Sequence, residues 1–276
     1  MKALSEEFKA QPVYLAPILA SLLVGFGCAY VLSLIPVPTY PVTPFPDTPS
    51  GSLSNAIYFV IIIAISATVF YLLLKWKSRK MITVLVGFAI TASSMLLSVF
   101  YLSAVLSDIP NWEILVLILA IAITVLFDFA IFKLGGKAQN AVVLILGGAL
   151  GVFLAYSIPL WSAVLILVFL AVYDVIAVYK GPVGKIASSG LDQLKGLSFS
   201  FRELQMGLGD LVFYSMLCGA MLLKIGWFSY LFSFVGIVAG SFVTFLLLEK
   251  KSIFPGLPVP ILLGLAGGFL GSLLPA

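Results

Sequence analysis

The stretch QMGLGD (residues 205–210) decides the architecture, because it opens a long apolar run that extends from Leu211 to Leu223. A carboxylate inside an apolar spanning segment is costly and by default marks a functional site. The two glycines just before Asp210 remove side-chain bulk, so that another backbone can come close. A second acid, Asp174, lies in the preceding apolar run. We interpret the two acids as a facing pair inside a membrane that carries out proton chemistry on water.

The composition excludes a soluble globular domain. Hydrophobic residues make up 62% of the 276 residues, charged residues make up 9%, and the mean hydropathy is +1.21. Soluble domains have roughly 45–50% apolar and about 25% charged residues. The chain is therefore expected to be an all-α, polytopic membrane protein in contact with the lipid bilayer. Its net charge of +4 is explained by Lys and Arg in loops that orient helices, so we expect no nucleic-acid partner.

Several kinds of chemistry are excluded by residue type. The chain has no histidine, so imidazole takes part in no mechanism. Cys28 and Cys218 stand singly in apolar runs, without the spacing of a metal site or of a disulfide framework. We therefore expect no cofactor and no metal. The first apolar run is too long for a signal-peptide core and lacks a cleavage site, so we expect it to remain as a helix.

A spanning helix needs about 20 apolar residues, and the chain offers nine such runs. The expected helices cover residues 13–35, 56–74, 81–106, 112–134, 141–157, 160–179, 206–225, 227–248 and 259–275. The proline-rich segment 36–51 is expected to be extended, since proline cannot continue a helix. We divide the chain into residues 1–158, for scaffold and substrate entry, and residues 159–276, for catalysis.

The basic residues orient this bundle. Fourteen of the 15 Lys and Arg residues fall on one side of the membrane in a nine-helix arrangement, and only Lys224 falls on the other. The positive-inside rule then puts the N-terminus in the cytoplasm and the C-terminus outside, and we expect the cell membrane as the location. Asp174 lies six residues before Lys180, roughly 9 Å along its helix, and Asp210 lies eight residues after Arg202. Both acids are thus expected in the cytoplasmic half.

Two carboxylates within a few ångströms of each other cannot both ionise, so such a pair shares one proton. The ionised acid can activate a water while the protonated acid polarises a carbonyl, as in aspartic proteases. The pair alone leaves proteolysis and ion- or proton-coupled transport equally open. A transporter predicts broken helices in inverted repeats with acids near the midplane. The sequence shows no repeat between its halves, and the acids lie toward one face.

Three motifs resemble the signatures of one family. Tyr173-Asp174 on the sixth helix, GLGD (207–210) on the seventh and Pro255-Gly256-Leu257 before the ninth are similar to the YD, GxGD and PAL motifs of presenilins and signal peptide peptidases. Gly256 replaces the family's Ala, and a register that starts at Pro258 is an alternative. Prepilin peptidases share GxGD, but they have a different helix arrangement and no PAL-type motif.

The resemblance implies a nine-helix, presenilin-like intramembrane aspartyl protease, which we interpret as a prokaryotic homologue. It implies single-span membrane proteins or signal peptides as substrates and Asp174 and Asp210 as catalytic residues. The substrate-binding residues that it implies are Tyr173, Gly207, Leu208, Gly209, Pro255, Gly256, Leu257 and Pro258.

Each of these implied roles has a local physical reason. Gly207 and Gly209 would admit the substrate backbone, and Leu208 would touch a substrate side chain. The stretch Pro255–Pro260 would resist regular helix and offer free carbonyls to an extended peptide. A spanning substrate must unwind before water can attack. The segment 180–205 would supply a pairing edge or a gate over the acids, or else be a flexible linker.

Three further features carry less specific signals. Asp128, on the fourth helix, is expected to have a packing or snorkelling role, with a third acid near the site as the alternative. Tyr214, one turn after Asp210, is a candidate hydrogen-bond partner of that acid. Glycine pairs such as Gly147 with Gly151 are expected to permit close helix packing, and only secondarily a homo-oligomer.

Overall fold

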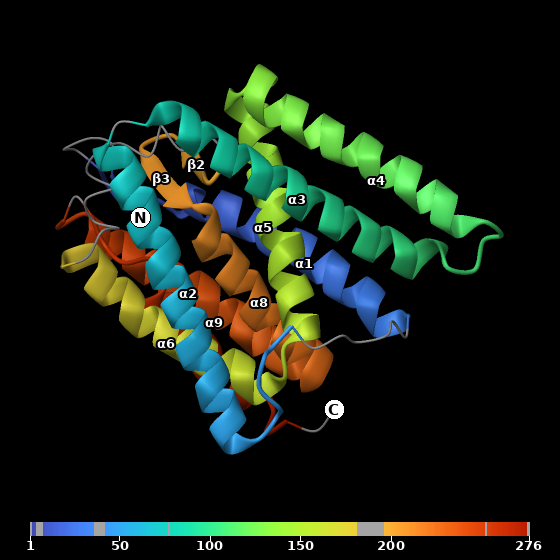
Figure 1. Cartoon of the computed structure of the whole chain (residues 1–276). Helices are drawn as coiled ribbons and strands as arrows, with labels where there is room; N and C mark the ends of the chain where they lie inside the picture. Colours follow the sequence, from blue (N-terminus) through green and yellow to red (C-terminus); the bar gives the residue numbers. More distant parts are fainter. Residues whose placement is uncertain are drawn as a thin grey trace.

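The computed structural model describes residues 2–3, 8–35, 42–76, 78–180, 196–251 and 253–274. These residues form a bundle of nine α-helices with a small antiparallel sheet at one end (Figure 1). The helices are α1 (Ala16–Leu34), α2 (Pro49–Lys75), α3 (Arg79–Leu106), α4 (Trp112–Phe129), α5 (Gly136–Ser157), α6 (Leu160–Tyr179), α8 (Leu208–Lys224), α9 (Trp227–Leu248) and α10 (Pro258–Gly271). A 3₁₀ turn, η1 (Pro12–Leu15), leads into α1, and a π-helical turn, η2 (Ala130–Leu134), closes α4.

Seven helical segments in the described ranges are long and apolar enough to cross a membrane. Two further helices, α8 with 17 residues and α10 with 14, are shorter. Large apolar side chains cover much of the outside of the bundle; Val84 is 71% exposed and Phe88 is 74% exposed. Because such a surface is stable only in lipid, the protein is an integral membrane protein. The expected all-α polytopic class is confirmed.

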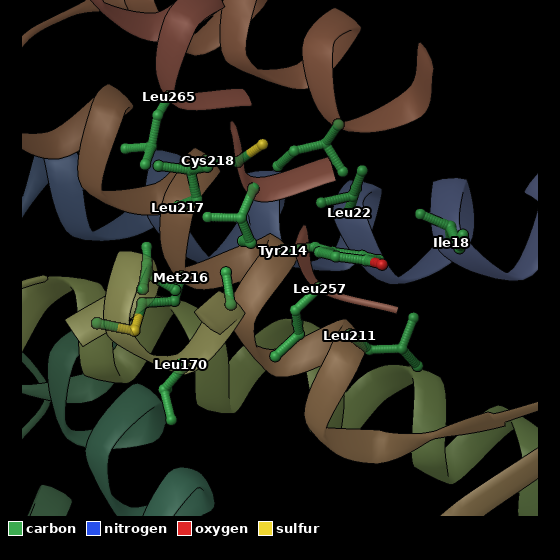
Figure 2. Packing of buried hydrophobic residues seen from close by; sticks show 14 of the residues in the cluster. Ile18, Leu22, Leu170, Leu211, Tyr214, Met216, Leu217, Cys218, Leu257 and Leu265 are labelled. Atoms are coloured by element: carbon green, nitrogen blue, oxygen red, sulfur yellow. The ribbon is translucent and has the colours of Figure 1, made fainter. Parts of the chain in front are cut away.

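Helix α8 lies at the centre of the bundle and contacts α1, α5, α6, α9 and α10. Ten of its residues, between Leu211 and Met221, are buried. Figure 2 shows Leu211, Tyr214 and Leu217 of α8 packed in one cluster with side chains of α1 and α6. The helix that carries Asp210 is therefore packed against five other helices of the bundle.

Glycines permit the closest helix contacts around this centre. A Cβ added at Gly151 of α5 would lie 2.3 Å from the carbonyl oxygen of Val212, so no side chain fits there. At Gly240 of α9 an added Cβ would lie 2.6 Å from Cα of Pro260 in α10. The expected role of small residues in packing helices within the chain is thus confirmed.

The remaining helices form the periphery of the bundle. Helices α3 and α4 pack mainly on each other and extend away from the centre, and α2 lies along α6 (Figure 1). Few residues of the spanning part of α2 are buried. Near its amino-terminal end, however, α2 is fixed by Asn55, whose side-chain amide donates to the Ser162 hydroxyl of α6 at 3.1 Å.

Two helices begin five or more residues earlier than the sequence predicted. Helix α2 begins at Pro49, not at residue 56, because Thr48 caps it: its hydroxyl accepts the Gly51 N–H at 3.0 Å, and proline suits the first helical position. The end of the segment expected to be extended is thus helical, while residues 36–41 lie outside the described residues. Helix α5 begins at Gly136, not at residue 141, so its polar first turn is helical too.

Two other boundaries differ near the motifs. Helix α8 begins at Leu208, not at residue 206, because the preceding residues form a strand. That strand, β3 (Leu204–Gly207), pairs antiparallel with β2 (Ser198–Phe201). The sheet order is β1-β3-β2, where β1 is Lys2–Ala3. The segment 180–205 therefore does supply a hairpin, although residues 181–195 lie outside the described part. Helix α10 ends at Gly271, before residue 275.

Candidate active site

The hairpin brings Asp210 to the start of α8. Strand β3 ends at Gly207, which is also the N-cap of α8, and the Leu208 N–H donates to the Leu197 carbonyl at 2.8 Å. Asp210 then falls in the first helical turn and is partly buried. The short path from strand to helix fixes the acid directly beside the sheet.

Asp174 lies on α6, which packs against α8. It is partly buried, and the adjacent residues Leu257 and Gly256 of the loop before α10 lie against Asp174 and Asp210, respectively. The structure thus brings the two acids of the sixth and seventh membrane helices together, as the sequence predicted.

The loop before α10 touches both acids through neighbouring residues. The backbone N–H of Leu257 donates to Oδ2 of Asp174 at 3.0 Å. A Cβ added at Gly256 would lie 2.7 Å from Oδ2 of Asp210, and its three nearest atoms would all belong to that carboxylate. Pro255, Gly256 and Leu257 are buried. The register that starts at Pro255 is therefore the one that reaches both acids, and Pro258 is already the first residue of α10.

The loop offers fewer free carbonyls than its prolines suggested. Pro258 and Pro260 lie in the first turn of α10, where a missing N–H costs no helical hydrogen bond. The Leu257 carbonyl accepts the Ile261 N–H at 3.0 Å, so it belongs to the helix. The expectation that the whole Pro255–Pro260 stretch resists regular helix is wrong.

Tyr214 hydrogen-bonds this loop, and not Asp210, for which it was a candidate partner. Its hydroxyl donates to the Gly256 carbonyl at 2.7 Å, and its side chain is fully buried. Figure 2 shows the Tyr214 ring beside Leu257. The bond ties α8 to the loop one turn after Asp210, so α6, α8 and the loop are joined around the pair of acids.

The glycines before Asp210 face open space. A Cβ added at Gly207 would meet nothing nearer than 3.9 Å, and one added at Gly209 nothing nearer than 3.8 Å. Gly209 is exposed. Unlike the glycines between helices, these two are not needed for packing within the chain. They leave room for another backbone beside Asp210.

The remaining residues singled out from the sequence, Leu208, Tyr173 and Asp128, lie in different surroundings. Leu208 turns toward α5, because its Cδ1 would lie 3.4 Å from a Cβ added at Gly147, and it packs against the core. Tyr173 is partly buried beside Asp174 on α6. Asp128 accepts a hydrogen bond from the Thr91 hydroxyl of α3 at 2.7 Å. That contact agrees with the packing role expected for Asp128.

The sequence did not predict the hydrogen bonds that join helix α5 to the β2–β3 hairpin. The Asn140 side chain of α5 donates to the Ser200 carbonyl at 2.7 Å and accepts the Ser200 N–H at 3.4 Å. A signal for the strand itself was present in Ser198–Phe201 (SFSF), which alternates polar and aromatic residues with the period of a strand.

Known proteins match both the sequence and the fold. The presenilin family model matches residues 184–275, which contain Asp210 and the loop before α10. Presenilin-B of Dictyostelium discoideum is 28% identical over 228 residues, which are 76% of this chain and 47% of that protein. The chain thus spans about half the length of this curated relative.

Two solved structures of a presenilin family intramembrane aspartate protease share the architecture. The one in space group C222 has a TM-score of 0.66 at 21% identity and covers 95% of this chain and 99% of that chain. The one in space group P2 has a TM-score of 0.62 at 21% identity, with 94% of each chain covered. The third of the chain that contains Asp210 and the loop before α10 is thus similar in sequence to the presenilin family, and nearly the whole chain shares its fold with the two solved structures.

Proposed function

We propose that this protein is an intramembrane aspartyl protease, which hydrolyses peptide bonds of membrane-spanning helices with Asp174 and Asp210. The observation that carries the proposal is the shared loop: Leu257 donates to one acid, and Gly256 packs on the other. The two acids therefore lie against the same peptide unit of the loop. An ion-coupled transporter finds no comparable support, because the fold matches that of a protease family.

The two acids divide the work in the proposed reaction. The pair carries one proton, because two carboxylates this close do not both ionise. The ionised acid removes a proton from a water, whose oxygen attacks the scissile carbonyl carbon, and the protonated acid donates its proton to the carbonyl oxygen. The tetrahedral diol then collapses: the C–N bond breaks, the nitrogen takes the proton that the first acid had removed, and one diol hydroxyl returns a proton to the second acid as the C=O bond re-forms. The pair returns to its initial state with one water consumed.

The substrate must reach the acids as an extended chain. A spanning helix bonds all its amides internally, and opening it in lipid leaves them without partners. The outer edge of strand β3, on which β1 pairs with Leu204 and Gln205, leads directly to Asp210, and a substrate strand would pair along this edge. The open space beside Gly207 and Gly209 then admits the scissile bond.

We place the protein in the cell membrane with its N-terminus in the cytoplasm. The distribution of Lys and Arg supports this orientation. Single-span proteins and signal peptides are the proposed substrates, since each presents one helix that can enter from the lipid. One chain supplies α6, α8 and the loop, so the proposed site needs no second copy of the protein. Residues 1–158 act as scaffold and residues 159–276 as the catalytic part; α1 and α5 support α8 from the scaffold side.

The test is cleavage of a single-span model substrate by the purified protein in detergent and in liposomes. We expect Asp174→Asn and Asp210→Asn each to lose at least about 10³-fold in rate. Asp128→Asn is the matched control, because it removes another membrane-helix acid away from the pair. It should cleave at the wild-type rate. Cleavage by either of the first two variants at the control's rate would end the proposal.

A further inference from the structure

We propose that strand β1 occupies the edge of β3 in the resting protein and competes there with the substrate, as a built-in mimic of a cleavage product. The inference rests on the proposed proteolytic function and adds a regulation of the same site. It starts from a simple observation: β3 is the central strand of the sheet, and the chain's own residues 2–3 pair with its outer edge.

The direction of β1 determines what it mimics. The pairing is antiparallel, with Lys2 opposite Gln205 and Ala3 opposite Leu204. The amino end of β1 is therefore directed along β3 toward Gly207, and Asp210 follows three residues later. A substrate in the same register would pair through residues on the carboxyl side of its scissile bond. Strand β1 thus takes the place that the carboxyl-side product holds after cleavage.

The other edge of the hairpin is closed by α5. Asn140 bonds both the carbonyl and the N–H of Ser200 on β2, and Gln139 donates to the Ser198 carbonyl at 3.4 Å. These side chains satisfy backbone groups that an added strand would need. Among the described residues, the edge of β3 is hence where a further strand can pair, and β1 already holds it.

The segment after β1 is anchored close to the hairpin. Phe8 is buried, and its ring lies 5.2 Å from that of Tyr14. The Tyr14 hydroxyl donates to Glu203, in the turn between β2 and β3, at 3.4 Å. The Ala10 N–H donates to the Glu249 carboxylate at the end of α9. Only four residues separate Ala3 from Phe8, so this anchor keeps β1 at a high effective concentration near β3.

The competition is reversible because β1 is short. A strand of two residues makes few ladder hydrogen bonds and is marginal on its own. A substrate that pairs along all of Leu204–Gly207 makes more of them and displaces it. Substrate can pair only with the fraction of protein in which the edge is free. Its apparent Kd is therefore the intrinsic Kd divided by that fraction. It also keeps unpaired backbone groups of β3 from association with other strands.

A disulfide between the two strands tests this placement. Directly opposite residues of an antiparallel pair lie about 4.5–5.5 Å apart at Cα, within the range of roughly 4.4–6.8 Å that a disulfide spans. Lys2→Cys with Gln205→Cys, in a chain carrying Cys28→Ala and Cys218→Ala, should cross-link on mild oxidation. The oxidised form should lose at least about tenfold in cleavage rate, and reduction should restore it. Each single cysteine variant should be indifferent to oxidant.

A second variant tests the inference without a change at the buried residue Gln205. Ala3→Pro removes an N–H and disfavours the strand. We expect KM for the model substrate to fall about three- to tenfold with kcat unchanged, whereas Lys2→Ala should keep KM within about twofold. The inference would be overturned if the double-cysteine variant formed no disulfide, or if its oxidised form cleaved substrate at the full rate. An unchanged KM in Ala3→Pro would overturn it as well. If the strands cross-link but the reduced, cysteine-free and wild-type proteins all fail to cleave, the proposed function fails and the strand's position stands.

Discussion

The backbone N–H of Leu257 donates to Oδ2 of Asp174 at 3.0 Å, so the loop before α10 is joined to α6 at the acid itself. The neighbouring residue, Gly256, packs on the carboxylate of Asp210. One peptide unit therefore sets the positions of both acids. Because the loop contacts both acids, substitutions in it should affect the chemical step as well as substrate binding.

Removal of this N–H should slow the chemical step. Leu257→Pro deletes the donor, and the φ of −79° at Leu257 is one that proline can adopt. We expect kcat to fall roughly 10- to 100-fold, since the bond holds Asp174 in place. Leu257→Ala is the matched control, because it loses the side-chain packing and keeps the N–H. Equal kcat values for the two variants would show that packing of the leucine, and not its N–H, is what the site uses.

An added methyl group at Gly256 should displace Asp210. In Gly256→Ala the new Cβ would lie 2.7 Å from Oδ2 and 2.9 Å from Cγ of Asp210, so the carboxylate must move. We expect kcat to fall about 10- to 100-fold, with thermal unfolding in detergent close to that of the wild type. The presenilin PAL motif, which Pro255-Gly256-Leu257 resembles, has Ala at this position, which makes the variant informative. Wild-type kcat would mean that Asp210 adjusts without loss, and the claim of a tight fit would be withdrawn.

The same change at Gly209 should affect binding. A Cβ there would meet nothing nearer than 3.8 Å, so Gly209→Ala should fold normally. Because the open space beside it is where we place the substrate backbone, KM should rise several-fold, roughly three- to tenfold, with a smaller change in kcat. Steady-state kinetics on the single-span substrate measure both constants. An unaltered KM would place the substrate elsewhere.

Loss of the Tyr214 hydroxyl should loosen the loop. In Tyr214→Phe the ring stays, but the Gly256 carbonyl loses a donor at 2.7 Å. An unsatisfied buried acceptor costs about 1–3 kcal/mol, so the free energy of unfolding should fall by about that amount and kcat should fall with it. Tyr230→Phe, on α9, is a comparison that removes a tyrosine hydroxyl outside the loop. If both variants behave alike, the Tyr214 bond has no special role in the site.

The dependence of cleavage on pH should be bell-shaped. The pair works with one proton, so the rate should decline at high pH, where that proton is lost, and at low pH, where both acids are protonated. The measurement is kcat/KM against pH, with Asp128→Asn as the control that should give the wild-type profile. A rate that rises steadily with pH would show that one ionised acid suffices.

The apolar runs predicted most of the helices, because lipid requires about 20 apolar residues per span. Helices α6 and α9 begin and end where the runs do. The prediction was wrong where polar residues belong to a helix, as in the capped start of α2 and the Asn140 turn of α5. The polar groups of those residues have hydrogen-bond partners distant in sequence or in a local cap. A pattern of hydrophobic residues does not reveal such partners.

The two acids could be singled out from the sequence, but the contacts around them could not. Burial cost and order along the chain pointed to Asp174 and Asp210. The partner of Tyr214 is a carbonyl 42 residues away, in a loop whose path depends on the whole bundle. Strand β1 contains two residues and has no periodicity of its own, so its pairing with β3 emerges only in three dimensions.

The most direct measurement of the central claim is a double-mutant cycle on the two acids in single-turnover cleavage of the model substrate. If Asp174 and Asp210 act as one unit around one water, the Asp174→Asn, Asp210→Asn and double variants should all be reduced to about the same residual rate. Losses that multiply, so that the double variant is slower than either single variant by the other's full factor, would show that the acids act independently and contradict the shared-proton mechanism.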